Sequence, residues 1–166
     1  MSTSVIAVFP GTFDPLTLGH QDLIRRSARM FGTVIVAVAA AHHKKTLFTL
    51  DERLDTVREV FAPLDNVRVE SFVGLVRDFA VAHGAKVMVR GVRSVTDFDY
   101  EAQLAGMNKS LAHDVDTIFL TPDSRFQFIS STLVREIATL QGDVASFVAP
   151  VVHTRLMEKL QHQRQG

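Results

Sequence analysis

The chain has 166 residues, with 18 Lys and Arg against 18 Asp and Glu, so its formal net charge is zero, and it contains no cysteine. The length fits one domain. The lack of cysteine excludes disulfides, Cys-ligated zinc, iron–sulfur clusters and a thiol nucleophile. The charge balance argues against coating nucleic acid or an anionic membrane, because proteins with those roles carry a basic excess.

We therefore expect one domain over residues 1–166, with 161–166 as a polar tail. The first residues, Met1–Val5, lack the basic and apolar regions of a signal peptide. The apolar stretch Val34–Ala41 is too short to span a bilayer. These observations predict a cytoplasmic location, with no membrane and no nucleic acid as partner.

The first third of the chain alternates between apolar runs and amphipathic stretches. The first run, Ile6–Phe9, ends at Pro10-Gly11, which predicts a turn. Apolar residues three and four apart predict a helix over about Gly19–Phe31. A second apolar run covers Val34–Ala41, and Thr49-Leu-Asp-Glu52 is typical of the capping box that begins a helix.

The rest of the chain repeats this alternation. Three further strands are predicted by short apolar runs at Val67–Val69, Lys86–Val89 and Thr117–Leu120. Helical patterns are found at 75–80, 100–111, 133–138 and 156–160. The stripe of the helix at 100–111 is predicted either to pack in the core or to lie between subunits, and it consists of Tyr100, Leu104, Met107 and Leu111.

Strands that alternate with helices predict an α/β fold, a doubly wound and Rossmann-like parallel sheet of about five strands. The apolar runs are nearly continuous, which is typical of strands buried on both faces. Ligands of such sheets bind beyond the carboxyl ends of the strands, so the segments that follow the strands are the candidate site.

The segment after the first strand contains a glycine turn and then a histidine at a helix start. Gly11 allows a close approach of a ligand to the backbone, and Thr12 offers a hydroxyl and an amide. Thr17-Leu-Gly-His20 opens the first helix, whose free N–H groups and dipole favour an anion. His20 can donate a ring N–H to a phosphate oxygen, and the alternative is that it merely packs or caps the helix.

Cationic side chains follow two of the predicted strands. Lys44 and Lys45 come after the second strand, where they can face phosphates as mobile charges or lie in a solvated loop. Arg90 and Arg93 flank Gly91 directly after the fourth strand. Guanidinium groups suit bidentate binding of phosphate, and the glycine lets backbone amides approach the same ligand.

Two pairs of residues near these cations have open roles. Asp97 and Glu101 can pair with the arginines, complement a helix N-terminus or accept a hydrogen bond from a ribose. His42 and His43 are adjacent, and we expect no metal there because side chains at successive positions diverge and no third ligand is near.

Hydroxyl groups gather before the fifth predicted helix. Ser130, Ser131 and Thr132 can cap that helix or present hydroxyls and free amides to a phosphate. Phe126 and Phe128 can border a base or belong to the core.

The order of these motifs resembles the nucleotidyltransferase superfamily. Within it, the chain from about Val5 to Leu160 resembles the bacterial phosphopantetheine adenylyltransferases. The matching stretches are Pro10–Pro15, Thr17–His20, Lys44–Thr49, Arg90–Arg93, Asp97–Glu101 and Phe128–Arg135. The resemblance implies transfer of AMP from ATP to 4′-phosphopantetheine, with dephospho-coenzyme A and pyrophosphate as products. This reaction is the penultimate step of coenzyme A synthesis, and it proceeds by direct in-line attack without a covalent enzyme intermediate.

The resemblance also implies roles for individual residues. The catalytic set would be His20, which stabilises the transition state, Lys44, which holds and orients the acceptor phosphate, and Arg93, which faces the polyphosphate of ATP. The ATP-binding set would be Thr12, Phe13, His20, Gly91, Val92, Arg93, Glu101, Phe126, Gln127, Phe128, Ile129, Ser130, Ser131 and Thr132. The phosphopantetheine-binding set would be Thr12, Lys44, Leu75, Val76 and Arg90. Mg²⁺ would be held by ATP phosphates and water rather than by the protein, and the assembly would be a homohexamer; the role of Arg135 stays open.

The sequence alone leaves other functions open. A nicotinate-nucleotide adenylyltransferase or a glycerol-phosphate cytidylyltransferase shares the Gly-His and Ser-Thr elements, although Lys44, Arg90, Arg93 and the short length favour the pantetheine enzyme. A nucleotide sensor without activity is a second alternative, and a purely structural subunit is a third.

Overall fold

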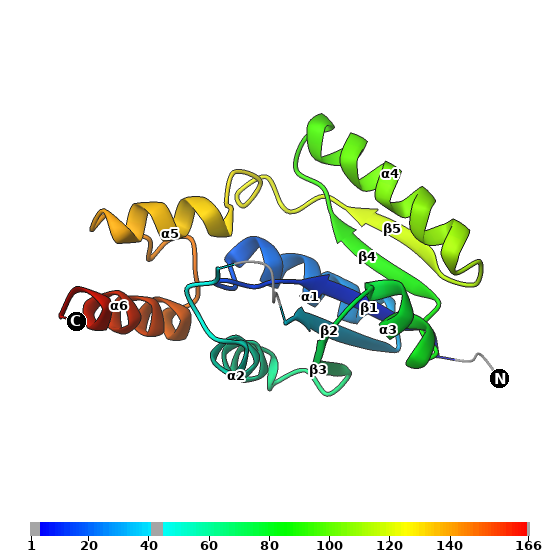
Figure 1. Cartoon of the computed structure of the whole chain (residues 1–166), viewed down its shortest axis with the longest axis horizontal. Coiled ribbons are helices and arrows are strands. Elements are labelled where there is room, and N and C mark those ends of the chain that lie inside the picture. Colours follow the sequence, from blue (N-terminus) through cyan, green and yellow to red (C-terminus); the bar gives the residue numbers. More distant parts are fainter. Residues whose placement is uncertain (1–3, 41–44, 166) are drawn as a thin grey trace.

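The computed structural model describes residues 4–40 and 45–165 and confirms the predicted α/β fold. Its five strands are all parallel and follow the order β3-β2-β1-β4-β5 (Figure 1). The strands are β1 (Ile6–Gly11), β2 (Thr33–Ala39), β3 (Val67–Phe72), β4 (Val87–Gly91) and β5 (Asp116–Leu120). The helices are α1 (Leu18–Met30), α2 (Leu50–Phe61), α3 (Val76–Ala82), α4 (Val95–Leu111), α5 (Ser131–Thr139) and α6 (Pro150–Gln165).

Both faces of the sheet are buried, which is why the strand sequences are nearly continuous in apolar residues. Alternate residues of β1 point to opposite sides, so that Phe9 belongs to one hydrophobic cluster and Val8 to the other. The larger cluster lies under α1, α2, α5 and α6, and the smaller one contains Ala80 of α3. Helices α5 and α6 lie together at one end of the molecule, and α4 runs beside β5 (Figure 1).

The strand order reverses direction between β1 and β4, and this is where the two strands separate. β1 pairs with β2 from Ile6 to Gly11, whereas its pairing with β4 covers Ala7 and Val8. Beyond Val8 the carboxyl ends of β1 and β4 therefore diverge and leave a crevice. Such a switch point is the usual ligand-binding place in open α/β sheets.

One prediction about an element boundary is wrong. Pro10-Gly11 does not form a turn but continues β1, because the pairing to β4 has already ended and a residue without N–H is tolerated there. Residues 161–165 are exposed and form the last part of α6. Within residues 4–40 and 45–165, no helix is both long and apolar enough to cross a membrane.

The stripe predicted on α4 does not pack in the core. Tyr100, Met107 and Leu111 are 66%, 67% and 50% exposed, and Glu101 is the buried residue of this helix. Helical periodicity placed these residues on one face, but it could not tell that the face is largely exposed.

Candidate active site

A cavity of about 620 Å³ lies at the carboxyl ends of β1 and β4, where the two strands separate. This volume is in the range of pockets that hold small-molecule ligands. Four helices begin at its rim, because the lining includes Gly19 of α1, Val76 of α3, Asp97 of α4 and Ser131 of α5. The cavity also contains His20, Arg90 and Arg93, so three of the groups predicted from sequence meet at one place.

The ring of His20 is oriented by a capping box at the start of α1. The Thr17 side chain accepts from the His20 amide (3.4 Å), and the Thr17 amide donates to Nδ1 of His20 (3.0 Å). Capping boxes normally use Glu or Gln at this position. Because Nδ1 accepts a hydrogen bond, the proton of the neutral ring is on Nε2, and the imidazole acts as a donor to the cavity.

The pKa of His20 is lowered from 6.5 to about 4, mainly because the ring is desolvated and also because the charge of Arg93 is near. His20 is therefore neutral at physiological pH and donates through Nε2. Its ring contacts Phe13 edge to face, with the two ring centroids 5.1 Å apart, and Phe13 itself is buried. The tautomer and the orientation of His20 are thus both fixed before a ligand binds.

The acidic residues after β4 hold the two arginines of the cavity. Glu101 is buried and accepts two hydrogen bonds from Arg90, at 2.8 Å from Nε and 2.7 Å from Nη2. Asp97 accepts from the backbone N–H of Arg93 (3.2 Å) and from its Nε (3.4 Å). Arg93 also donates to the carbonyl of Ile129 (2.9 Å), which joins the start of α4 to the loop before α5. The sequence left several roles open for Asp97 and Glu101, and in the structure both carboxylates pair with an arginine.

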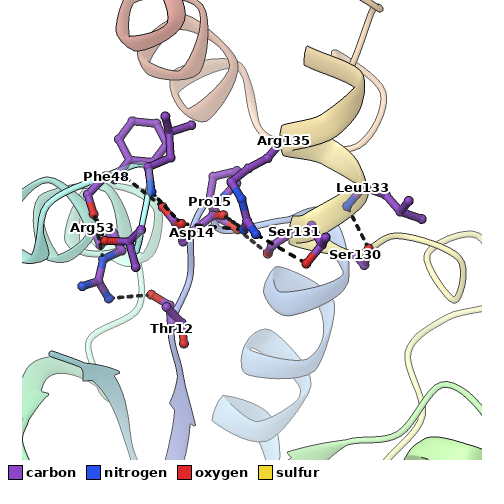
Figure 2. A network of polar contacts seen from close by, with 12 residues as sticks. Thr12, Asp14, Pro15, Phe48, Arg53, Ser130, Ser131, Leu133 and Arg135 are labelled. Atoms are coloured by element: carbon purple, nitrogen blue, oxygen red, sulfur yellow. Dashed lines mark hydrogen bonds and ion pairs between the residues drawn. The ribbon is translucent and has the colours of Figure 1, made fainter. Parts of the chain in front are cut away.

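The hydroxyls of Ser130 and Ser131 serve the fold, although both residues line the cavity at the start of α5. Ser130 caps α5 by accepting from the amide of Leu133 (3.1 Å), and Ser131 donates to the carbonyl of Pro15 (2.8 Å) (Figure 2). The amides of Ser131 and Thr132 belong to the first turn, where N–H groups have no partner within the helix. These amides, with the helix dipole, suit an anionic ligand.

Most of the other residues predicted for the site line the cavity. They are Thr12, Leu75, Val76, Gly91, Phe126, Ile129 and Thr132. Phe13 and Val92 are buried beside the cavity rather than in its lining. Gln127 and Phe128 are exposed and outside the lining, so Phe128 is not a core residue. The predictions for Lys44, His42 and His43 concern positions that lie outside the described residues.

Sequence reasoning missed two buried charges beside the cavity, Asp14 and Arg53, and left open the role of Arg135, which is half-buried and bonds to the loop that contains Asp14 (Figure 2). Arg53 was detectable, because it lies four residues before Val57 and eight before Phe61, on the apolar stripe of α2. A charged residue at a core position of an amphipathic helix needs a buried partner.

The described residues, 4–40 and 45–165, contain no group of three or more His, Asp or Glu able to hold a metal ion. The carboxylates that line the cavity are those of Asp97 and Glu101, and each is hydrogen-bonded to an arginine. This donor set suits anionic ligands rather than a protein-bound divalent cation.

Comparison with known proteins agrees with this geometry. The cytidylyltransferase-like family model matches residues 8–137. A phosphopantetheine adenylyltransferase of Acidovorax sp. (strain JS42) is 66% identical over 94% of both chains. One from Herminiimonas arsenicoxydans is 55% identical over 98% of this chain and 99% of that protein.

Solved structures with low sequence identity share the fold. A nicotinic acid mononucleotide adenylyltransferase of Plasmodium falciparum aligns with a TM-score of 0.68 at 13% identity, over 98% of this chain and 97% of that one. A bifunctional NMN adenylyltransferase/ADP ribose pyrophosphatase of Francisella tularensis aligns with a TM-score of 0.73 at 15% identity, over 96% of this chain and 50% of that one. With the matches above, the chain belongs to the phosphopantetheine adenylyltransferases of the cytidylyltransferase-like family.

Proposed function

We propose that this chain transfers AMP from ATP to 4′-phosphopantetheine and releases dephospho-coenzyme A and pyrophosphate, the penultimate step of coenzyme A synthesis. Relatives with this name are 52–66% identical over nearly the whole chain. The observation that carries the proposal is the cavity at the β1–β4 switch point, where a neutral histidine donor, two arginines and the N-termini of helices that include α1, α4 and α5 meet. These groups are donors and cations, which suit two polyanionic substrates.

The reaction needs alignment and charge stabilisation more than a protein nucleophile. The acceptor phosphate attacks the α-phosphorus in line, and negative charge accumulates on the α-phosphoryl oxygens. The Nε2–H of His20 is the donor for that charge, and Arg93 neutralises the departing pyrophosphate. The lone pair of the His20 ring is on Nδ1, which accepts from Thr17, and this supports a donor role rather than nucleophilic attack.

The nucleotide side of the proposed site contains the starts of α4 and α5. Gly91, Val92 and Arg93 contact ATP together with the loop from Phe126 to Thr132, and Phe13 does so through its backbone. The free amides at the start of α5 support this assignment. Glu101 is assigned to the ATP side as well, and its hydrogen bonds orient the guanidinium of Arg90, which belongs to the acceptor side.

The acceptor side contains Thr12, Lys44 and Arg90, which hold the phosphate of 4′-phosphopantetheine. Leu75 and Val76 line the wall for the pantetheine arm, whose gem-dimethyl group suits an apolar surface. Mg²⁺ is brought by ATP and is held by its phosphates and by water, since the carboxylates of the lining are already bound to arginines.

We also propose that the chain acts as a homohexamer in the cytoplasm, where ATP is available. The support for self-association is the exposed apolar surface of α4, in particular Tyr100, Met107 and Leu111. Single exposed apolar residues are ordinary, but a run of them along one helix is typical of an interface.

An acceptor panel tests the proposed reaction. Purified protein with ATP and Mg²⁺ is offered 4′-phosphopantetheine, nicotinate mononucleotide or glycerol 3-phosphate, the last also with CTP, and pyrophosphate is measured. We expect turnover with 4′-phosphopantetheine. Turnover with nicotinate mononucleotide alone would reject the assignment, and ATP binding without consumption in any mixture would favour the nucleotide sensor.

Replacing the acceptor cation tests the division of the site. Because the lysine is assigned to the acceptor phosphate, Lys44→Ala should weaken the apparent affinity for the phosphopantetheine substrate more than the apparent affinity for ATP. The reverse order would contradict the assignment. Steady-state kinetics with each substrate varied in turn gives both Michaelis constants.

A further inference from the structure

A buried arginine of α2 fastens together the segments that form one side of the cavity. Arg53 is 2% exposed and is not among the described residues that line the cavity. Through Nη1 it donates to the carbonyls of Thr12 (2.9 Å) and Ala39 (2.7 Å). It also donates to the carbonyls of Ala40 (3.4 Å, from Nη2) and Phe48 (3.3 Å, from Nε). One side chain therefore joins the loop after β1, the end of β2 and the segment before α2.

Asp14 makes a second connection between the same segments. It is 3% exposed, lies in the loop after β1, and accepts from the amides of Leu47 and Phe48, each at 2.9 Å (Figure 2). The guanidinium of Arg135, in α5, donates to the backbone carbonyl of Asp14. The loop after β1 is thus held from the α2 side and from the α5 side.

These contacts reach the cavity through the residues they hold. Thr12 and Ala39 both line it, and both of their carbonyls bind the same nitrogen of Arg53. The described residues on either side of positions 41–44 are fastened as well, because Arg53 holds Ala40 and Asp14 holds Leu47. A shift of either anchor would move cavity-lining backbone on two elements at once.

The chemistry of the guanidinium explains why an arginine is used here. Its planar fork satisfies four carbonyls in different directions, which the single ammonium of a lysine cannot do. Burial of the guanidinium without hydrogen bonds would be costly, and the four hydrogen bonds of Arg53 offset this cost. The negative charge of Asp14 offsets the effect of burial, which by itself lowers the pKa of Arg53.

We propose that Arg53 and Asp14 are positioning residues for the acceptor side of the cavity, because they set the spacing between the loop after β1 and the segments that flank positions 41–44. The proposal rests on the proposed function, in which Lys44 and Thr12 bind the acceptor phosphate. Helix α2 contributes no residue to the cavity lining in the described part of the chain. The proposal nevertheless gives α2 an influence on catalysis, exerted through the residues that Arg53 holds.

Arg53→Lys tests the proposal, and Arg155→Lys is the matched control. Arg155 also holds α2, through Thr56 Oγ1 (2.7 Å) and Glu59, but from the side of α6 and away from the cavity. We expect Arg53→Lys to lower kcat/KM for the phosphopantetheine substrate by about 10- to 100-fold, the scale of an ångström-sized misplacement. The KM for ATP should change by less than about threefold, and Arg155→Lys should leave both kinetic constants near those of the parent chain.

Melting temperatures measured on the same samples separate positioning from stability, and assays are run well below the melting point of each variant. Asp14→Asn is the second variant. It keeps the size of the side chain but removes one of the two oxygens that accept hydrogen bonds from the amides of Leu47 and Phe48. The kinetic constants for the phosphopantetheine substrate should therefore again change more than those for ATP.

Equal changes in the KM values of both substrates would overturn the proposal. It would also be overturned if the kinetics of Arg53→Lys and Asp14→Asn matched those of Arg155→Lys. Failure of the parent chain to use 4′-phosphopantetheine would instead refute the proposed function. The two failures are therefore distinguishable in one set of assays.

Discussion

At the scale of single residues, the decisive feature is the protonation of His20. Its Nδ1 accepts from the Thr17 amide, its neighbour Arg93 is cationic, and its pKa is lowered to about 4. The half-buried and oriented ring thus stays neutral and keeps Nε2–H as a donor. Sequence reasoning found His20 because of its place at a helix start, but the tautomer depends on a contact that spacing alone does not reveal.

We predict that the ring of His20 does not titrate between about pH 5.5 and pH 8 in the free protein, whereas an ordinary histidine has a pKa near 6.5. The reason is the cost of charging a desolvated ring beside Arg93. Two-dimensional NMR of the histidine ring protons measures this, with His20→Gln to assign the signal. A midpoint between pH 6 and 7 would contradict this interpretation of the site.

Removal of the donor should reduce the rate. His20→Ala is expected to lower kcat by about 10²–10³, the scale for loss of one oxyanion-type donor, with a much smaller change in ATP affinity. His20→Gln retains an N–H donor and should keep more of the rate than alanine does. A near-normal kcat in His20→Ala would remove this residue from the mechanism.

At the scale of elements, the sequence predicted what depends on local chemistry. The capping box at Thr49 is present, with Thr49 Oγ1 accepting from the Glu52 amide (3.2 Å) and Glu52 accepting from the Thr49 amide (2.8 Å). The strands β1 and β2 were also predictable, because burial on both faces leaves a plain apolar run.

Long-range features were not predictable in the same way. Arg53 and Asp14 act between segments far apart in the sequence, as in the bond from the Phe48 amide to Asp14. The extended conformation of Pro10 depends on where β1 and β4 separate. That place is a property of the sheet and cannot be inferred from the Pro-Gly dipeptide. Local patterns therefore located the site, while tertiary contacts determined how its groups are held.

The capping box gives a prediction about stability. Thr49→Ala should lower the free energy of unfolding by about 1 kcal/mol, because the Glu52 amide loses its acceptor at an exposed helix start. Thr49→Ser keeps the hydroxyl and should cost much less. Chemical denaturation of the three proteins measures the difference, and equal losses for alanine and serine would show that the cap contributes nothing.

A histidine between α3 and β4 links stability to pH. His83 Nδ1 lies 2.8 Å from the carbonyl of Phe79 and Nε2 lies 2.8 Å from Glu70 Oε2. Both partners are acceptors, so the charged ring is favoured; the bond to Phe79 is the largest cause that raises the pKa of His83, against some opposition from burial.

A raised pKa in the folded state adds stability below the unfolded pKa of about 6.5, and this contribution is lost as pH rises through the folded value. The stability difference between the parent chain and His83→Gln should therefore be larger at about pH 5.5 than at about pH 8.5. Thermal or urea unfolding at both pH values gives this difference. A larger difference at the higher pH would contradict the assignment of the charged form.

At the scale of the whole molecule, the zero net charge of the chain recurs locally in the site, where arginines and carboxylates are paired. The positive groups of the cavity, Arg90 and Arg93, are held by Glu101 and Asp97, so charge is balanced locally while donors still face the ligand. Helix α4 has a run of apolar residues that remain exposed in the single chain.

This surface leads to a prediction about assembly. Light scattering should give a mass of about six times the 18.4 kDa of one chain. Met107→Glu, at a residue 67% exposed on α4, should lower that mass, whereas Leu140→Glu, 83% exposed at the end of α5, should not. A parent chain with the mass of a single copy would refute self-association.

The central claim is that the cavity aligns two substrates and stabilises charge, with His20 as a donor and not as a nucleophile. The stereochemical course at phosphorus tests this most directly. ATP made chiral at the α-phosphorus with sulfur is converted with 4′-phosphopantetheine, and the configuration of the dephospho-coenzyme A analogue is determined. One in-line displacement predicts inversion, whereas retention would mean two displacements and a covalent intermediate on the protein, which would contradict the account.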